Sequence, residues 1–107
     1  MATVSVIYPR EEGANFDFDY YVNVHLPLVG SRWSEAGLIG GEALKGAPGP
    51  DGGESPFFAI GLIHFESMEA LGAAMNGEHA SEIIGDIANF TTVRPVMQVN
   101  ERIGGAS

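Results

Sequence analysis

The stretch Phe16-Asp-Phe-Asp-Tyr-Tyr-Val-Asn-Val-His-Leu-Pro-Leu28 determines how the rest of the chain is interpreted. It places two acids, two tyrosines and His25 at the start of a predicted helix, which Asn15 or Asp17 can cap. Pro27 then follows His25 by two residues. A proline inside a helix removes one backbone hydrogen bond and clashes with the carbonyl four residues earlier, at a cost of roughly 3 kcal/mol. Pro27 interrupts the helix beside His25, the side chain that titrates most readily near neutral pH. This position indicates that the interruption sets the direction in which the imidazole points.

The helix that begins in this stretch is predicted to run to Ala36, with Gly37 as its stop. Its apolar and aromatic side chains recur at helical spacing on most of its surface. The rows are Tyr20, Val24 and Leu28, then Val22, Leu26, Val29 and Trp33, with Tyr21 and His25 between them. Such a wide apolar surface predicts burial against a sheet and against a second element, either another helix or a partner subunit.

The remaining elements follow from apolar runs and turn residues. Strands are predicted at 3–8, 38–45, 57–66 and 92–103, and helices at 68–75 and 78–90. The order is therefore β-α-β-β-α-β, the ferredoxin-like arrangement of an α+β sandwich, which carries both helices on one face of a four-stranded sheet. Strand 57–66 is apolar on both faces, as expected of a central strand. The open face of the sheet thus calls for cover by a second copy.

Smaller signals refine these elements. Ser67 is a predicted N-cap for the helix that follows it. The pair Gly40-Gly41 marks a bulge in the second strand. Pro95 cannot donate a hydrogen bond to a ladder, so the last strand is expected at an edge of the sheet.

Length and composition limit the partners. With 107 residues we expect one domain, 1–107. The net charge of −9 argues against nucleic acid and anionic membranes, which both need clustered Lys and Arg. There is no cysteine, and the N-terminus lacks a signal-peptide pattern, so we expect a cytoplasmic protein.

His25 is the first candidate for chemistry, because the ordinary pKa of histidine suits a general acid or base. Tyr21 precedes it by one helical turn, so the two side chains can meet. The alternative is that His25 packs at a helix surface and hydrogen-bonds a carbonyl freed by Pro27. Residue physics alone leaves both interpretations open.

Other candidates are weaker. His64 lies on a predicted strand and can face a ligand or an interface. His79, Glu82 and Asp86 share one side of a predicted helix, a spacing that suits a metal but is more often a solvated face. Tyr20 and Trp33 can line an aromatic pocket or pack in the core. No phosphate loop, HExxH or GxSxG motif is present.

The run from Phe16 to Val29 resembles the "FD-x-x-YY-x-x-x-H-x-PLV" signature of the EthD family. Two later segments are similar to the same family's "F-x-S-x-E-A" and "D-I-x-N-F-T" patterns: Phe65-Glu-Ser-Met-Glu-Ala-Leu71 and Asp86-Ile-Ala-Asn-Phe-Thr91. The resemblance covers nearly the whole chain. The family takes its name from a protein encoded with an ether-degrading oxygenase system.

The resemblance implies a dimeric α+β barrel, in which the sheets of two ferredoxin-like subunits pack face to face. Relatives on this fold include lactone isomerases, polyketide cyclases and decarboxylases, and cofactor-free monooxygenases, which act on small, mostly apolar molecules. His25 matches the family's histidine, and Tyr21 and Asp86 match motif positions.

From these observations we predict a homodimer that binds a compact aromatic, lactone or polyketide-like molecule and needs no cofactor or metal. His25 would be the general acid or base and Tyr21 a hydrogen-bond donor. Further ligand contacts are predicted from four residues: Tyr20, Trp33, His64 and Asp86. One alternative is a non-catalytic accessory protein of a degradation pathway. Another is a haem or metal oxidoreductase with His25, His64 or His79 as ligand.

Overall fold

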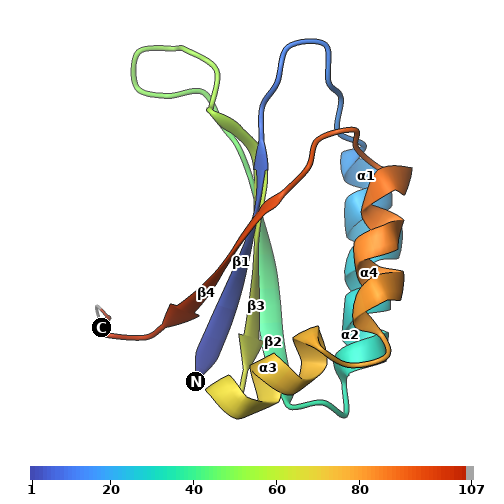
Figure 1. Cartoon of the computed structure of the whole chain (residues 1–107). Helices are drawn as coiled ribbons and strands as arrows, with labels where there is room; N and C mark the ends of the chain where they lie inside the picture. The colour runs from blue at the N-terminus through green and yellow to red at the C-terminus, as the bar shows by residue number, and fades with distance from the viewer. Residues whose placement is uncertain (106–107) are drawn as a thin grey trace.

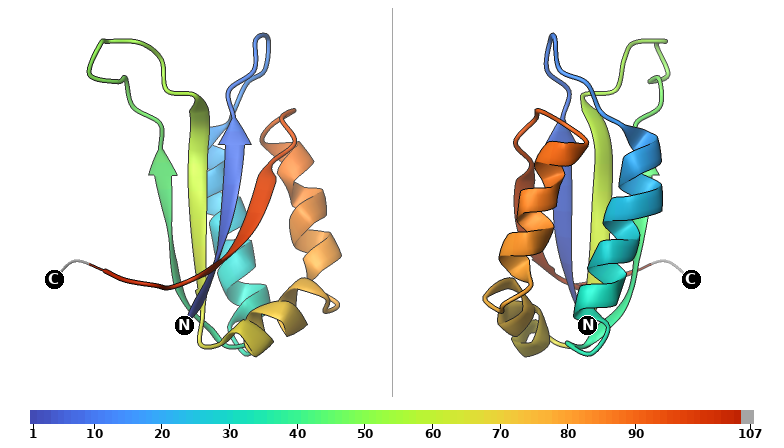
Figure 2. Two further views of the ribbon diagram at one scale, coloured as in Figure 1. Left: turned by 60° about the vertical axis from the view of Figure 1, so that its left-hand side comes forward. Right: turned by 90° about the vertical axis from the view of Figure 1, so that its right-hand side faces the viewer.

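A computed structural model describes residues 1–105 as a four-stranded antiparallel sheet with helices on one face (Figures 1 and 2). The strands are β1 (Ala2–Pro9), β2 (Leu38–Lys45), β3 (Phe57–Phe65) and β4 (Val96–Glu101), in the spatial order β2-β3-β1-β4. The helical segments are α1 (Phe18–Tyr20), the π-helical turn η1 (Tyr21–His25), α2 (Leu26–Trp33), α3 (Met68–Met75), α4 (Ala80–Asp86) and the 3₁₀ turn η2 (Ile87–Asn89). The predicted α+β, ferredoxin-like order βαββαβ is confirmed.

The strands agree closely with the sequence pattern. β2 has the predicted bounds, and its register shifts between Leu38 and Gly40, directly before the pair Gly40-Gly41 where the bulge was expected. β3 is central, between β2 and β1. β4 lies at an edge and begins directly after Pro95, later than the predicted residue 92, because proline cannot join the ladder.

The two faces of the sheet differ because side chains alternate along a strand. On β1, the alternate residues from Ala2 to Tyr8 are buried beneath the helices, and the residues between them are half-buried on the open face. Residues that are paired across neighbouring strands point to the same face of the sheet, so the register assigns the residues of the other strands to one face or the other. The open face therefore carries Thr3, Ser5, Ile7, Glu42, Leu44, Ile60, Leu62, His64, Val96, Gln98 and Asn100.

The first helical run begins as predicted and changes form at the proline. The carboxylate of Asp17 caps it by accepting a hydrogen bond from the Tyr20 amide at 3.1 Å. The chain then widens into η1, where the Leu26 amide donates to the carbonyl of Tyr21, five residues earlier. A π turn is wider than an α turn, so it can accommodate the ring of Pro27 without a break. The helix continues to Trp33 rather than Ala36.

The buried surface of this helix is narrower than the sequence predicts. Only the row Tyr21, His25, Val29 and Trp33 is fully buried against the sheet and α4. Val22 and Val24 are 52% and 46% exposed. Tyr20, Leu26 and Leu28 are half-buried against the core, so the helix presents one fully buried row with partly buried residues beside it.

The second half of the chain contains two short helices. Ser67 caps α3 as predicted, accepting a hydrogen bond from the Ala70 amide at 3.0 Å. α4 lies beside α2 on the same face of the sheet (Figure 2). Ala80 and Ile83 of α4 are buried, as is Ile87 of η2, whereas Ile84 is 46% exposed. Within residues 1–105, no helix is long and apolar enough to cross a membrane.

Candidate functional site

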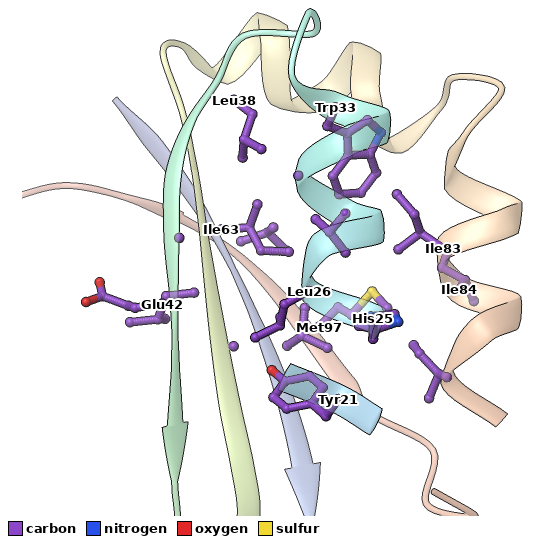
Figure 3. A pocket seen from close by; sticks show the side chains of 18 of the residues that line it. Tyr21, His25, Leu26, Trp33, Leu38, Glu42, Ile63, Ile83, Ile84 and Met97 are labelled. Atoms are coloured by element: carbon purple, nitrogen blue, oxygen red, sulfur yellow. The ribbon is translucent and has the colours of Figure 1, made fainter. Parts of the chain in front are cut away.

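A cavity of about 300 Å³ lies between the sheet and the helices α2 and α4 (Figure 3). Its walls are apolar and come from β1, β3, α2, α4 and η2, including Val4, Val6, Leu26, Val29, Trp33, Ile63, Ile83 and Ile87. Gly30, Gly40, Gly41 and Gly61 also line it. A cavity with these dimensions and walls suits a compact, mostly apolar molecule.

Few polar groups reach the cavity. Within residues 1–105, its lining contains neither Lys nor Arg. Glu42 belongs to the lining, but its carboxylate points away from the cavity, and it accepts a hydrogen bond from His64 on the open face of the sheet (Figure 3). The other side chains of the lining that carry a polar group are His25, Tyr8, Tyr21 and Trp33, whose indole N–H can only donate. Because a buried anion needs a paired cation, this lining favours a neutral ligand.

His25 is held at the wall of the cavity by a carboxylate. Its side chain is only 5% exposed, and its Nδ1 lies 2.9 Å from Oδ2 of Asp86 at the end of α4. The imidazole packs against two aromatic rings that also contact each other, with centroids 5.9 Å from Tyr21 and 4.7 Å from Phe90. Packing and hydrogen bonding together fix its orientation.

Asp86 accepts two further hydrogen bonds. The Tyr20 hydroxyl donates to its Oδ1 at 2.7 Å, and the Asn89 side-chain amide donates to the same atom at 2.9 Å. Burial by itself would raise the pKa of Asp86, but the hydrogen bonds from Asn89, His25 and Tyr20 more than offset it and lower that pKa. Asp86 is therefore a carboxylate at neutral pH.

The charge of Asp86 assigns the proton on His25. A carboxylate can only accept hydrogen bonds, so Nδ1 of His25 must carry a hydrogen and donate it. In the neutral ring, Nε2 then has a free lone pair, and no other described residue donates a hydrogen bond to it. This is the arrangement of a positioned general base.

Tyr21 extends toward the sheet from the same helical segment. Its hydroxyl lies above Gly61 of β3, only 2.8 Å from where a side-chain Cβ would stand at that position. Burial raises the pKa of Tyr21 to about 12, so its hydroxyl keeps its proton and is a donor at neutral pH. The side chain is held edge-on against Tyr8, with ring centroids 5.7 Å apart.

Comparison with solved structures decides the family. An EthD-like protein from Ralstonia eutropha JMP134 has 37% sequence identity and a TM-score of 0.88, and the match covers 99% of this chain and 95% of that one. The chain belongs to the EthD family. An EthD family protein from Bacillus halodurans C-125 shares the fold, at 23% identity and a TM-score of 0.67 over 96% of this chain and 99% of that one.

The EthD fold extends to more distant proteins. An antibiotic biosynthesis monooxygenase has a TM-score of 0.51 at 11% identity, over 97% of the EthD chain and 100% of its own. No family model and no curated protein matched. The neighbours therefore establish the EthD family and the fold, while the chemistry must be argued from the site.

The structure of this EthD protein separates the six predicted site residues into three groups. His25, Tyr21 and Trp33 line the cavity. Asp86 and Tyr20 are not part of the lining and stand behind His25, where Tyr20 hydrogen-bonds Asp86. The sixth residue, His64, lies on the open face of the sheet. Its Nδ1 is 2.7 Å from the Thr3 hydroxyl and its Nε2 is 3.0 Å from Glu42.

The residues of the possible metal trio have separate partners. Glu82 forms an ion pair with Arg32 at 2.7 Å, and Asp86 turns toward His25. His79 is 3.6 Å from Glu78. Among residues 1–105 no group of three or more His, Asp or Glu side chains could hold a metal ion.

Three functional residues were missed from sequence. Gly61 lies inside the predicted strand 57–66, and a glycine inside a strand can signal a close approach of another group, here the Tyr21 hydroxyl. Alternation along the strand puts Tyr8 on the same face as Val4 and Val6, but its neighbours across the fold do not follow from the sequence. Asn89 follows Asp86 by three residues, a spacing that could have suggested the hydrogen bond between them.

Replacing Asp86 with asparagine is expected to remove a stabilising charge in a pH-dependent way. Because the folded-state pKa of Asp86 is lowered, its contribution is present above the ordinary carboxyl pKa of about 4. It is lost as the pH falls through the lower folded-state value. Urea unfolding followed by Trp33 fluorescence should show a wild-type advantage at neutral pH that shrinks in acid.

Glu35→Gln is the matched control, because Glu35 is exposed and forms no ion pair with another described residue. This variant should show no comparable pH dependence. The wild type should lose its greater stability over Asp86→Asn in acid. If the difference in the free energy of unfolding stayed the same well below pH 4, the negative charge of Asp86 would not be its cause.

Proposed function

We propose that this EthD-family protein binds a compact, neutral, mostly apolar aromatic, lactone or polyketide-like molecule and catalyses proton transfer on it without a cofactor. The observation that carries the proposal is the His25–Asp86 pair at the wall of an apolar cavity. His25 is the general acid and base, and Asp86 positions it. Isomerisation and cyclisation are the reaction types that such a site serves for a neutral molecule, whereas decarboxylation would need a carboxylate, which this lining disfavours.

The proposed step begins at a carbon next to a carbonyl group. Nε2 of His25 takes the proton from that carbon, and the electron pair of the C–H bond moves into a new double bond with the carbonyl carbon. The carbonyl oxygen gains the negative charge and accepts a hydrogen bond from the Tyr21 hydroxyl. The protonated imidazole is stabilised by Asp86 and returns its proton to a carbon or oxygen of the intermediate.

The surroundings support this role. An apolar cavity excludes water, so each charge–dipole interaction inside it is stronger than in solution. The hydrogen bonds of Tyr20 and Asn89 hold Asp86 in place, and Asp86 in turn fixes the ring of His25. A base whose direction is set in advance loses less conformational entropy on reaching the transition state.

The test is exchange of hydrogen for deuterium at carbon. Small cyclic ketones, lactones and neutral polyketide-like compounds are first screened for thermal stabilisation of the protein, because binding to the folded state raises its melting temperature. Each hit is then incubated in D₂O and followed by NMR at the carbon next to its carbonyl. Deuterium incorporation that depends on the protein supports proton transfer. Binding without any incorporation would instead indicate a non-catalytic accessory protein.

We also propose a homodimer formed through the open face of the sheet. This face exposes apolar side chains from every strand, among them Leu44 at 50% and Val96 at 56% exposure. Ile7 and Ile60 pair at its centre and are half-buried. An apolar patch on a sheet is costly in water and is typical of a protein interface.

Light scattering should give twice the 11.3 kDa mass of the chain. Ile60→Lys, which places a charge at the centre of the open face, should shift the mass toward a single chain. Val22→Lys adds the same charge on the helical side, where Val22 is 52% exposed, and should leave the mass unchanged. A wild-type mass of one chain would contradict the dimer.

A further inference from the structure

Two tyrosines meet at the cavity from different parts of the fold. Tyr8 comes from β1 and is 1% exposed, and Tyr21 comes from η1 and is 3% exposed. Their rings pack edge to face with centroids 5.7 Å apart, and both residues line the cavity. Tyr8 is held further by edge-on contacts with Phe16 and Phe90, so neither ring is free to turn away.

Both hydroxyls lack a partner among residues 1–105, since no hydrogen bond from either one to another described residue is present. A fully buried hydroxyl without a partner is costly. Neither hydroxyl oxygen is fully buried, because every fully buried side-chain nitrogen or oxygen among the described residues has a hydrogen-bond partner. Both residues line the cavity, and we take it as the space to which their hydroxyls open.

The ionisation of the two hydroxyls agrees with this placement. Burial raises the pKa of Tyr8 far above its ordinary value, and the neighbouring Tyr21 raises it further. Burial also raises the pKa of Tyr21, to about 12. Both hydroxyls therefore stay protonated and able to donate at neutral pH.

Gly61 makes the space for this pair. A Cβ at residue 61 would stand 2.8 Å from the Tyr21 oxygen, closer than a carbon and an oxygen can approach without a shift. The hydroxyl of Tyr21 can therefore occupy its position only because residue 61 has no side chain. This explains a glycine in the middle of the central strand β3, where it weakens the strand.

We infer that the hydroxyls of Tyr8 and Tyr21 together receive one oxygen atom of the ligand, so that the ligand is a neutral carbonyl compound that passes through an enolate. The inference rests on the proposed function and adds Tyr8 as a second donor. As His25 takes the proton from carbon, the carbonyl π electrons move to oxygen, and both hydroxyls donate to the resulting oxyanion. When the proton returns to carbon, the carbonyl reforms, so the step needs no other reactant.

A phenol and its oxygen-free analogue test the oxygen site directly. 4-Chlorophenol resembles an enol in having one acidic oxygen on a flat apolar ring, and chlorobenzene lacks that oxygen. Calorimetry measures the affinity of each, and NMR of 4-chlorophenol labelled with ¹³C at the carbon bearing the oxygen reports whether the bound oxygen is ionised.

We expect the wild-type protein to bind 4-chlorophenol more tightly than chlorobenzene and to shift the bound phenol toward its ionised form. Tyr8→Phe and Tyr21→Phe should each weaken 4-chlorophenol roughly 10–100-fold, the usual loss for a hydrogen bond to a charged group. Chlorobenzene should bind as before, because both substitutions keep the ring. The ¹³C signal should return toward that of the neutral phenol.

Gly61→Ala tests the position of the Tyr21 hydroxyl without removing it. It should weaken 4-chlorophenol in the wild-type background and have little further effect on it when combined with Tyr21→Phe. Gly72→Ala is the matched control, because a Cβ there meets nothing within 4 Å. It should leave the affinities for both probes unchanged.

Equal affinity of the wild type for the two probes, or no binding of either, would overturn the inference. So would Tyr8→Phe binding 4-chlorophenol as tightly as the wild type. These outcomes are separate from the proposed proton transfer. Deuterium exchange that is lost in His25→Gln while both probes bind alike would retain the function and reject the oxygen site. Tyrosine-dependent binding of 4-chlorophenol without any deuterium exchange would retain the oxygen site and reject the proposed proton transfer.

Discussion

Replacing His25 with alanine is expected to slow deuterium exchange on a bound carbonyl compound by about 10²–10⁴-fold, the usual contribution of a general base. The reason is that Nε2 of His25 is the only basic group at the cavity among the described residues, since the Glu42 carboxylate points to the open face. The measurement is the rate of deuterium incorporation by NMR, with the most stabilising ligand of the thermal screen.

Two further variants separate chemistry from structure. His25→Gln keeps a side-chain N–H for Asp86 but has no basic nitrogen, so it should fold and bind ligand yet lose exchange to a similar extent. His79→Ala removes a histidine that is 40% exposed at its side chain and should exchange at the wild-type rate. Undiminished exchange in both His25 variants would show that His25 serves packing rather than proton transfer.

Phe65→Ala is expected to cause the largest loss of stability, about 3–5 kcal/mol in the free energy of unfolding. Phe65 is 0% exposed and packs edge-on against Trp33, with ring centroids 5.6 Å apart. Its removal opens a cavity between β3 and α2, which cannot close because both elements are held by the rest of the sheet and core. Each kcal/mol corresponds to about 4–8 °C in melting temperature for a chain of this size.

Urea unfolding can be followed by the fluorescence of Trp33, the only tryptophan of the chain. Phe57→Ala is the matched control, because Phe57 lies on the same strand and is 37% exposed. Phe57→Ala should lower the free energy of unfolding clearly less than Phe65→Ala does. If Phe65→Ala leaves too little folded protein to measure, Phe65→Leu should still lower the unfolding midpoint. A loss for Phe65→Ala no larger than that for Phe57→Ala would contradict the central place of Phe65 in the core.

Most elements could be predicted because their signals are local. Ser67 and Asp17 cap helices through their own side chains, and Pro95 stops a strand through its own backbone. Alternation of side chains was enough to assign Val4, Val6 and Tyr8 to one face of β1. The first helix was predicted less well, since its π turn relieves a clash of Pro27 with the preceding turn and changes which rows are buried.

The candidate site was predictable only in part. His25 and Tyr21 share one helical segment, so their proximity followed from spacing alone, and their rings do stack. Asp86 lies 61 residues further along the chain, and its bond to His25 depends on how α4 packs beside α2. His64 could not be assigned a side from sequence, because strand β3 is apolar on both faces.

The sequence by itself determined the order of the elements, the alternation of side chains along β1, and a histidine and a tyrosine one turn apart. These properties depend on neighbours along the chain. Only the tertiary structure decided that Asp86 orients His25, that Glu42 and His64 turn to the open face, and that the hydroxyl of Tyr21 stands over Gly61 beside Tyr8. These contacts join residues distant in sequence, and they arise from the packing of two helices on a twisted sheet.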